Sequence, residues 1–173
     1  MNPVHRITFL LIAVVAGWAM LNGCEEKSHS TPSPMDLYQF SKQGELRFLN
    51  ASGDSIARID IEIADSENKI ILGLMFRRSM REDQGMLFIF AEEDYRGFWM
   101  KNTYFSLDML FIDSQGIIRN IHRNTLPLSE NVYPSEVPVQ YVLEVVAGYA
   151  NRHLIQPGFR VEWETYVEQK QSN

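Results

Sequence analysis

The runs GMLFIF at residues 85–90 and LDMLFI at residues 107–112 decide the fold class of this chain. Each run is short and almost entirely apolar, which predicts a β-strand with both faces buried. YVLEVV at residues 141–146 has the same character, and FWMK at residues 98–101 predicts another strand between the first two. Several short apolar runs in one chain are typical of a β-rich domain.

The flanking segments add half-buried strands and two helices. Isoleucine alternates with acidic residues over 59–63, and apolar with polar side chains over 159–167, as on strands with one solvated face. Ser66 can cap a helix with apolar side chains at three–four spacing up to Met75, and residues 147–154 predict a second short helix. We therefore expect a mainly β (α+β) fold, a compact antiparallel β-barrel or sandwich of about seven short strands with two short helices.

Residues 124–138 form a long segment without a regular period, and it contains Pro127, Pro134 and Pro138. A loop of this length in a small domain is either functional or covers the edge of a core. Covering apolar surface is the role that we expect for it.

Residues 1–23 predict an export signal. A weakly basic start with His5 and Arg6 precedes an uncharged stretch over residues 7–21. As a helix this stretch spans about 22 Å, less than the ~30 Å of a bilayer core, which favours a cleaved signal peptide over an uncleaved anchor. The stretch ends in Leu21-Asn22-Gly23-Cys24, which resembles the lipobox of bacterial lipoproteins and implies a lipid on Cys24.

The rest of the chain divides into a linker and one domain. Residues 24–43 comprise the lipidated Cys24 and a polar, proline-containing flexible linker, and residues 44–173 form a single globular β-rich domain. We expect an exported, membrane-anchored lipoprotein whose membrane partner is reached through the lipid on Cys24. Glu25, where retention at the inner membrane would favour Asp, indicates the periplasmic side of the outer membrane if the cell has two membranes.

The charge balance and residue counts exclude several classes of function. The chain has 16 basic and 22 acidic side chains, a formal net charge of −6, and loss of Arg6 with the signal peptide changes this to −7. An acidic chain without a basic stripe repels phosphate backbones, so no nucleic-acid partner is expected. One cysteine and four histidines without ligand spacing predict no metal and no cofactor.

A series of short motifs lies along the domain: Gly73-Leu74-Met75-Phe76-Arg77, Gly85-Met86-Leu87-Phe88, Phe98-Trp99-Met100-Lys101-Asn102-Thr103, Leu107-Asp108, Val142-Leu143-Glu144 and Ala147-Gly148. Together they resemble the uncharacterised family known as domain of unknown function 192, over residues 57–163. Ser106 departs from the proline that the family usually has there. The resemblance implies a small β-rich fold that is often exported, and it supplies no established reaction.

Asp108 and Glu144 are the candidate site residues with the clearest chemistry, because both acids lie in strands that are apolar on both faces. Burying an unpaired carboxylate costs several kcal/mol, so each acid requires a cation, backbone donors or a solvated cleft. One hypothesis is a buried polar network with Lys101, predicted opposite Asp108 in a hairpin. Asn102 and Arg77 are further partners in that network. The other is a ligand pocket in which both acids lie beside Trp99.

Two functions follow from these alternatives. The first is a non-catalytic, lipid-anchored envelope domain that binds a small polar ligand, a glycan or a partner protein, with no catalytic residues. The alternative is a glycan-directed hydrolase with Asp108 and Glu144 as its acid/base pair, which requires carboxyl groups about 5–9.5 Å apart across one cleft. The sequence favours the non-catalytic function and leaves the hydrolase as the open alternative.

Overall fold

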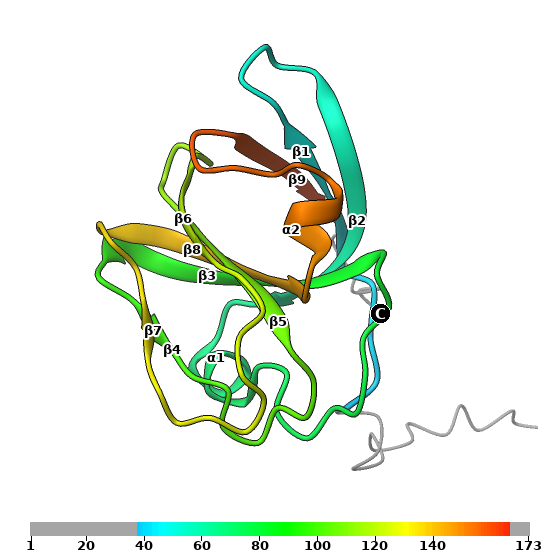
Figure 1. The fold of residues 1–173 in the computed structure, drawn as a ribbon, viewed down its shortest axis with the longest axis vertical. Coiled ribbons are helices and arrows are strands. Elements are labelled where there is room, and N and C mark those ends of the chain that lie inside the picture. Colours follow the sequence, from blue (N-terminus) through cyan, green and yellow to red (C-terminus); the bar gives the residue numbers. More distant parts are fainter. Residues whose placement is uncertain (1–37, 167–173) are drawn as a thin grey trace, which may run out of the picture. The chain divides into compact units, whose positions relative to one another are not determined.

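The computed structural model describes residues 38–166, which form a seven-stranded sheet, a two-stranded sheet and two short helices (Figure 1). The predicted signal peptide, Cys24 and most of the predicted linker lie outside these residues. The elements in chain order are β1 (Gly44–Leu49), β2 (Ser55–Ala64), α1 (Glu67–Leu72), β3 (Gln84–Asp94), β4 (Gly97–Phe98), β5 (Leu107–Ile112), β6 (Ile118–His122), β7 (Tyr133–Pro134), β8 (Val139–Val146), α2 (Tyr149–Arg152) and β9 (Arg160–Thr165). The expected mainly β fold with two short helices is confirmed.

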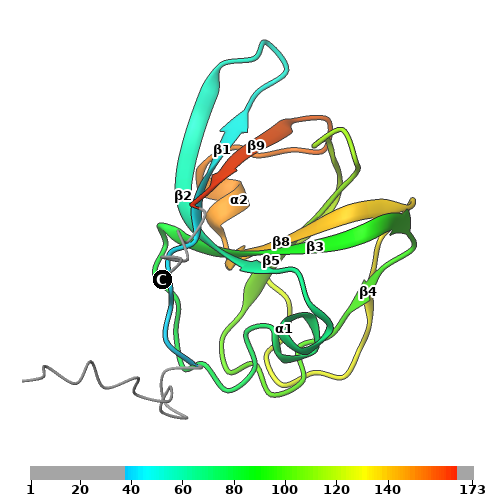
Figure 2. The ribbon, with the colours of Figure 1, turned by 180° about the vertical axis from the view of Figure 1, so that it is seen from behind.

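The large sheet is sandwich-like and does not close into a barrel, so the barrel alternative is wrong. Its strand order is β6-β5-β8-β3-β2-β1-β9, with β6 and β9 as the edge strands. The residue before β6, Ile117, forms one isolated bridge with Arg160 of β9. Within the described residues β6 has a continuous ladder only with β5, so this single bridge does not close the sheet. Figures 1 and 2 show β1, β2 and β9 on one side of α2 and β3 with β8 on the other.

The sheet is mixed rather than wholly antiparallel. β2 and β3 are parallel, because α1 connects them as a crossover, whereas the other neighbouring strands pair antiparallel. α1 therefore lies against the middle of the sheet, next to the strands that carry Glu62 and Glu144. No helix within residues 38–166 is long and apolar enough to span a membrane.

Two hydrophobic cores lie on the two faces of the central strands. Side chains alternate between faces along a strand, so Leu110 and Leu143 join the core beneath α2. Met109 and Phe111, which flank Leu110 in β5, join the second core, beneath α1 and the β4–β7 ribbon. All six residues of β5 are buried, which confirms that residues 107–112 form a strand covered on both faces.

Two local predictions are wrong. The first helix ends at Leu72 rather than near Met75, because Gly73 adopts a positive φ of 47° as its C-cap. β4 is shorter than predicted and pairs with β7, not with β5. The chain leaves it through a turn in which the Thr103 N–H donates to the Met100 carbonyl at 3.1 Å.

Candidate functional site

Four side chains form a row across one face of the sheet. Glu62 of β2 is the register partner of Met86 of β3, Met86 is the partner of Glu144 of β8, and Glu144 is the partner of Met109 of β5. Directly paired residues share a face of a sheet. Two buried carboxyl groups therefore lie on the face of the second core, separated by one methionine.

The first carboxyl, Glu62, forms a buried ion pair with Arg77. Arg77 follows α1, and its Nη1 donates to Oε2 of Glu62, while the Ser41 N–H donates to Oε1 at 3.0 Å. Both side chains of the pair are buried. Arg77 Nε is also buried, and within residues 38–166 it has no hydrogen-bond partner. Arg77 thus pairs with Glu62, and not with Asp108 or Glu144 as the buried-network hypothesis predicts.

The second carboxyl, Glu144, is buried, with only 4% of the residue exposed. Among the described residues it has no hydrogen-bond or ion-pair partner. Burial raises the pKa of Glu144 from 4.5 to about 8, and the positive charge of Arg77 opposes this rise. At neutral pH the carboxyl is therefore mostly protonated, and it can both donate and accept a hydrogen bond.

Glu144 lies in a small cavity of about 40 Å³, which we call the Glu144 pocket. Its wall comes from residues 70–75 around the end of α1, from Phe88 and Phe98, and from the loop residues Trp99, Lys101 and Thr103. Gly73 contributes to this close packing, because an added Cβ would lie 3.2 Å from the Phe88 ring. The pocket combines one unpartnered carboxyl with an aromatic wall.

A larger hollow of about 390 Å³ adjoins the Glu144 pocket, and the two share Ile70, Ile71, Phe98 and Trp99 in their walls. Trp99 is 46% exposed. Lys101 Nζ lies 5.0 Å from the centroid of the Trp99 ring and 3.3 Å from Oε1 of Glu130. Trp99, Lys101 and Glu144 therefore line one pocket, but Asp108, which the ligand-pocket hypothesis also places there, is not among the lining residues.

Asp108 lies on the opposite face of the sheet. Its register partner is Val145, next to Glu144 in β8. Asp108 is completely buried, and its two carboxyl oxygens accept the backbone N–H groups of Asn124 at 2.9 Å and Ala150 at 3.0 Å. Asp108 thus ties α2 to the start of the loop after β6.

Two predictions about Asp108 are therefore wrong. The first is the ion pair with Lys101, which pairs with Glu130 because β4 does not form a hairpin with β5. The second is the acid/base pair with Glu144, because a sheet lies between the two carboxyl groups and they cannot face one cleft. Asp108 and Glu144 cannot form the catalytic pair of a glycan hydrolase.

Asn102 shapes the loops beside the pocket and does not line it. It has a positive φ of 56°, and its carbonyl accepts the Phe76 N–H at 2.7 Å. Sequence reasoning missed Glu62, Phe88 and Phe98. Glu62 alternates with isoleucines and was therefore expected on a solvated face. Within residues 38–166 no group of three or more histidine, cysteine or acidic side chains can hold a metal ion.

Comparison with known proteins shows to which family this chain belongs. Residues 48–163 match the model of domain of unknown function 192 (DUF192), described as "Uncharacterized ACR". The chain belongs to this family. The DUF192 match includes every residue of the Glu144 pocket. A search among curated proteins found no match.

Two solved structures are similar to this DUF192 chain. A Sinorhizobium meliloti protein, proposed to be a transcription regulator, is 44% identical, with a TM-score of 0.68 over 72% of this chain and 97% of that chain. A protein of unknown function from Novosphingobium aromaticivorans is 28% identical, with a TM-score of 0.66 over 77% of this chain and 100% of that chain. The family relationship does not assign a reaction.

Proposed function

We propose that this protein is an exported, lipid-anchored domain of the cell envelope that binds a carbohydrate or similar polyol without chemical turnover. The observation that carries the proposal is Glu144, a buried carboxyl that has no partner among the described residues and lies in a pocket beside Trp99. The Glu144 oxygens are not among the fully enclosed side-chain atoms without a partner, and Glu144 lines the pocket, so a ligand hydroxyl that enters the pocket can bond to them.

The sizes of the two spaces support a specific mode of binding. About 40 Å³ is enough for a small polar group such as a hydroxymethyl group, because one water molecule needs only about 10–15 Å³ of such space. The adjoining hollow of about 390 Å³ is large enough for a sugar ring. In this mode the hydroxyl bonds Glu144, and the C–H face of the ring packs against Trp99.

A single carboxyl supports binding rather than hydrolysis. General acid/base cleavage of a glycoside uses two carboxyl groups that flank one bond. Glu62 of the same row is already paired with Arg77. The pocket therefore offers one titratable acid, suited to recognition.

Location and anchoring complete the proposal, and the sequence supports them. Leu21-Asn22-Gly23-Cys24 after an uncharged stretch favours export and acylation at Cys24, and Glu25 favours the outer membrane of a two-membrane cell. The regulatory role proposed for the Sinorhizobium relative is not favoured for this chain, because a net charge of −6 repels DNA.

Calorimetric titration of residues 38–173 with glucose and with xylose tests the proposed ligand. Xylose is the matched control, because it has the same pyranose ring without the hydroxymethyl group. We expect glucose to bind more tightly than xylose. We expect Glu144→Leu, which keeps the bulk of the side chain but can neither donate nor accept, to weaken glucose binding at least about tenfold, since a lost hydrogen bond to a buried group costs ~1.5 kcal/mol or more.

The exposed acid Glu162, which pairs with Arg47 on the sheet surface, provides the control variant Glu162→Gln, which should bind as the wild type does. Absence of glucose binding, or equal glucose affinity in wild type and Glu144→Leu, would contradict the proposal.

A further inference from the structure

Three loops are joined by backbone hydrogen bonds at the end of the domain that carries α1. The Phe76 N–H donates to the Asn102 carbonyl at 2.7 Å, and the Leu128 N–H donates to the Thr103 carbonyl at 3.0 Å. A third bond connects the Met100 N–H to the Ser129 carbonyl at 2.9 Å. Residues 76, 102–104 and 128 are therefore neighbours, although they are far apart in the sequence.

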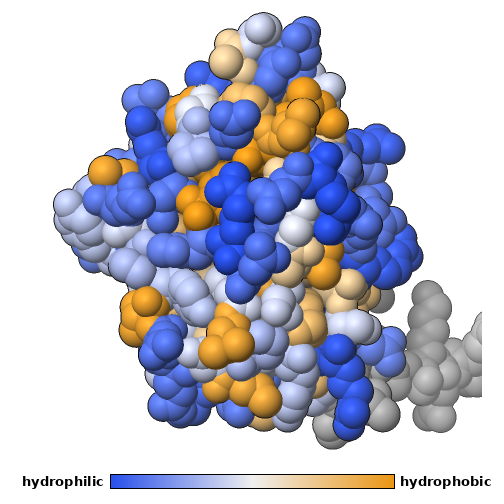
Figure 3. Space-filling view, viewed as in Figure 1, coloured by the Kyte–Doolittle hydropathy of each residue, from blue (hydrophilic) through white to orange (hydrophobic). Residues whose placement is uncertain are grey.

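Each of these loops exposes a large apolar or aromatic side chain. Phe76, Tyr104 and Leu128 are 43%, 52% and 57% exposed. The ring of Tyr38, the first described residue, packs edge-on against Phe76 with centroids 5.8 Å apart. We call Tyr38, Phe76, Tyr104 and Leu128 the apolar rim. Figure 3 shows hydrophobic side chains on the same end of the molecule, below the sheet.

Two members of the rim have an unfavourable backbone conformation. Phe76 has a φ of 64° and Leu128 a φ of 59°. Bulky L-residues rarely adopt positive φ, whereas asparagine adopts it more readily. The chain thus places phenylalanine and leucine where a small polar residue would fit the backbone better and would expose less apolar surface. Strain combined with exposure at neighbouring positions indicates a functional surface.

The position of Tyr38 indicates what covers the rim. Residues 24–37 connect Cys24 to Tyr38, and fourteen residues span at most about 50 Å. A lipid on Cys24 therefore keeps the rim within that distance of a bilayer, and the chain enters the domain at the rim itself.

We propose that the apolar rim rests on the surface of the phospholipid bilayer to which the chain is anchored. Phe76 and Leu128 enter the boundary of the acyl chains, and the hydroxyl groups of Tyr38 and Tyr104 lie among the headgroups, as is usual for tyrosine at membrane interfaces. The inference rests on the lipid anchor of the proposed function and not on its ligand.

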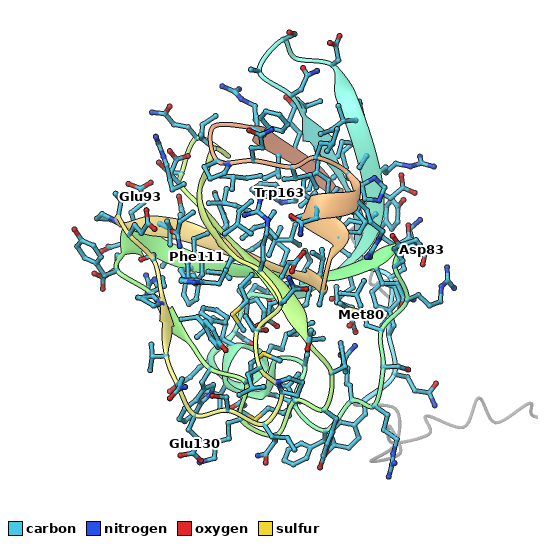
Figure 4. All side chains as sticks on the ribbon, viewed as in Figure 1. Met80, Asp83, Glu93, Phe111, Glu130 and Trp163 are labelled. Carbon is cyan, nitrogen blue, oxygen red and sulfur yellow. The ribbon has the colours of Figure 1, made fainter. Side chains whose placement is uncertain are left out.

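Quenching by brominated lipid tests the contact. The full chain is purified in detergent and reconstituted into vesicles of phosphatidylcholine brominated in its acyl chains. Tyr104→Trp supplies the probe after Trp18, Trp99 and Trp163 are each replaced by phenylalanine. The reference chain keeps Trp163 as its single tryptophan, because Trp163 and the loop end marked by Glu130 lie in opposite halves of the domain (Figure 4). We expect the probe to lose most of its emission and the reference to lose none.

The double variant Phe76→Asn/Leu128→Asn, introduced into the probe chain, removes apolar surface from the rim. Asparagine adopts the positive φ at these two positions more readily than phenylalanine or leucine does. Its urea midpoint should equal or exceed that of the parent, and quenching should fall to the level of the reference. A probe quenched no more than the reference overturns the proposal. A second outcome also overturns it: the chain forms a dimer in detergent, the double variant abolishes that dimer, and the probe stays unquenched in vesicles. A second copy of the chain would then cover the rim.

Mass spectrometry of the same vesicles separates the rim from the anchor. An acylated Cys24 with an unquenched probe overturns rim contact and leaves the anchor standing. A quenched probe on a chain without acyl groups supports rim contact and contradicts the anchor.

Discussion

Replacing Glu144 by glutamine is expected to flatten the dependence of the unfolding free energy on pH. Burial raises the pKa of Glu144 from 4.5 to about 8, so the folded chain holds this proton more tightly than the unfolded chain does. The stability contributed by the neutral carboxyl is therefore complete below about pH 4.5 and is lost as the pH rises through about 8. Glutamine keeps the shape of the side chain and has no proton to lose.

The size of the effect follows from the difference between the two pKa values. Each unit corresponds to ~1.4 kcal/mol, so 3.5 units (8 − 4.5) correspond to ~5 kcal/mol once the pH exceeds 8. At pH 5 the loss is ~1 kcal/mol, and at pH 7 it is ~3 kcal/mol. Between pH 5 and pH 9 the unfolding free energy of Glu144→Gln should therefore rise by ~4 kcal/mol relative to that of the wild type.

Urea unfolding of residues 38–173 at pH 5, 7 and 9, with tryptophan fluorescence as the signal, measures this difference. Glu162→Gln controls for the removal of one negative charge from an exposed position. Stability curves of wild type and Glu144→Gln that run parallel from pH 5 to pH 9 would refute the reasoning, because Glu144 would then not titrate between the two pKa values.

Three further predictions concern the other acids and the anchor. Asp108→Asn should lower the unfolding free energy by ~3 kcal/mol in urea titrations, because the new amide group meets a backbone N–H and cannot accept its hydrogen bond; an unchanged midpoint would contradict the assigned contacts. Glu62→Gln should cost ~3–5 kcal/mol by leaving Arg77 buried without its partner, against ~0–1 kcal/mol for Glu162→Gln at the exposed pair; equal losses would show that burial of the pair is unimportant. Cys24→Ala should leave an unprocessed precursor without acyl groups, and mass spectrometry of detergent-extracted wild type that finds an unmodified Cys24 would rule out the lipoprotein assignment.

The sequence predicted the β-rich fold class because strand burial is a local property. A run such as residues 107–112, with apolar side chains at both odd and even positions, needs cover on both faces, and the structure buries all six residues. The same argument identified Asp108 and Glu144 as buried acids before any partner was known. The motifs around residues 73–148 also sufficed to identify the DUF192 family.

The sequence did not predict the conformation of the loops near the site. FWMK has the composition of a strand, yet the chain turns at Asn102, which has a positive φ. The Met100 N–H donates to the Ser129 carbonyl, so this segment pairs with a loop almost thirty residues away instead of with β5. Glu62 has the alternation of a solvated face, but Arg77 and the segment at Ser41 cover it. In both cases a partner distant in the chain overrides the local pattern.

The sequence by itself thus determined that the strands at residues 107–112 and 141–146 are buried, that they bury Asp108 and Glu144, and which family the chain belongs to. Tertiary structure alone decided that Glu144 enters a pocket beside Trp99 while Asp108 binds backbone N–H groups on the other face. Alternation fixes the relative facing of residues within one strand, but the facing of residues on different strands depends on their register. That register, with Met109 beside Glu144 and Val145 beside Asp108, is set when β5 and β8 pair across the sheet.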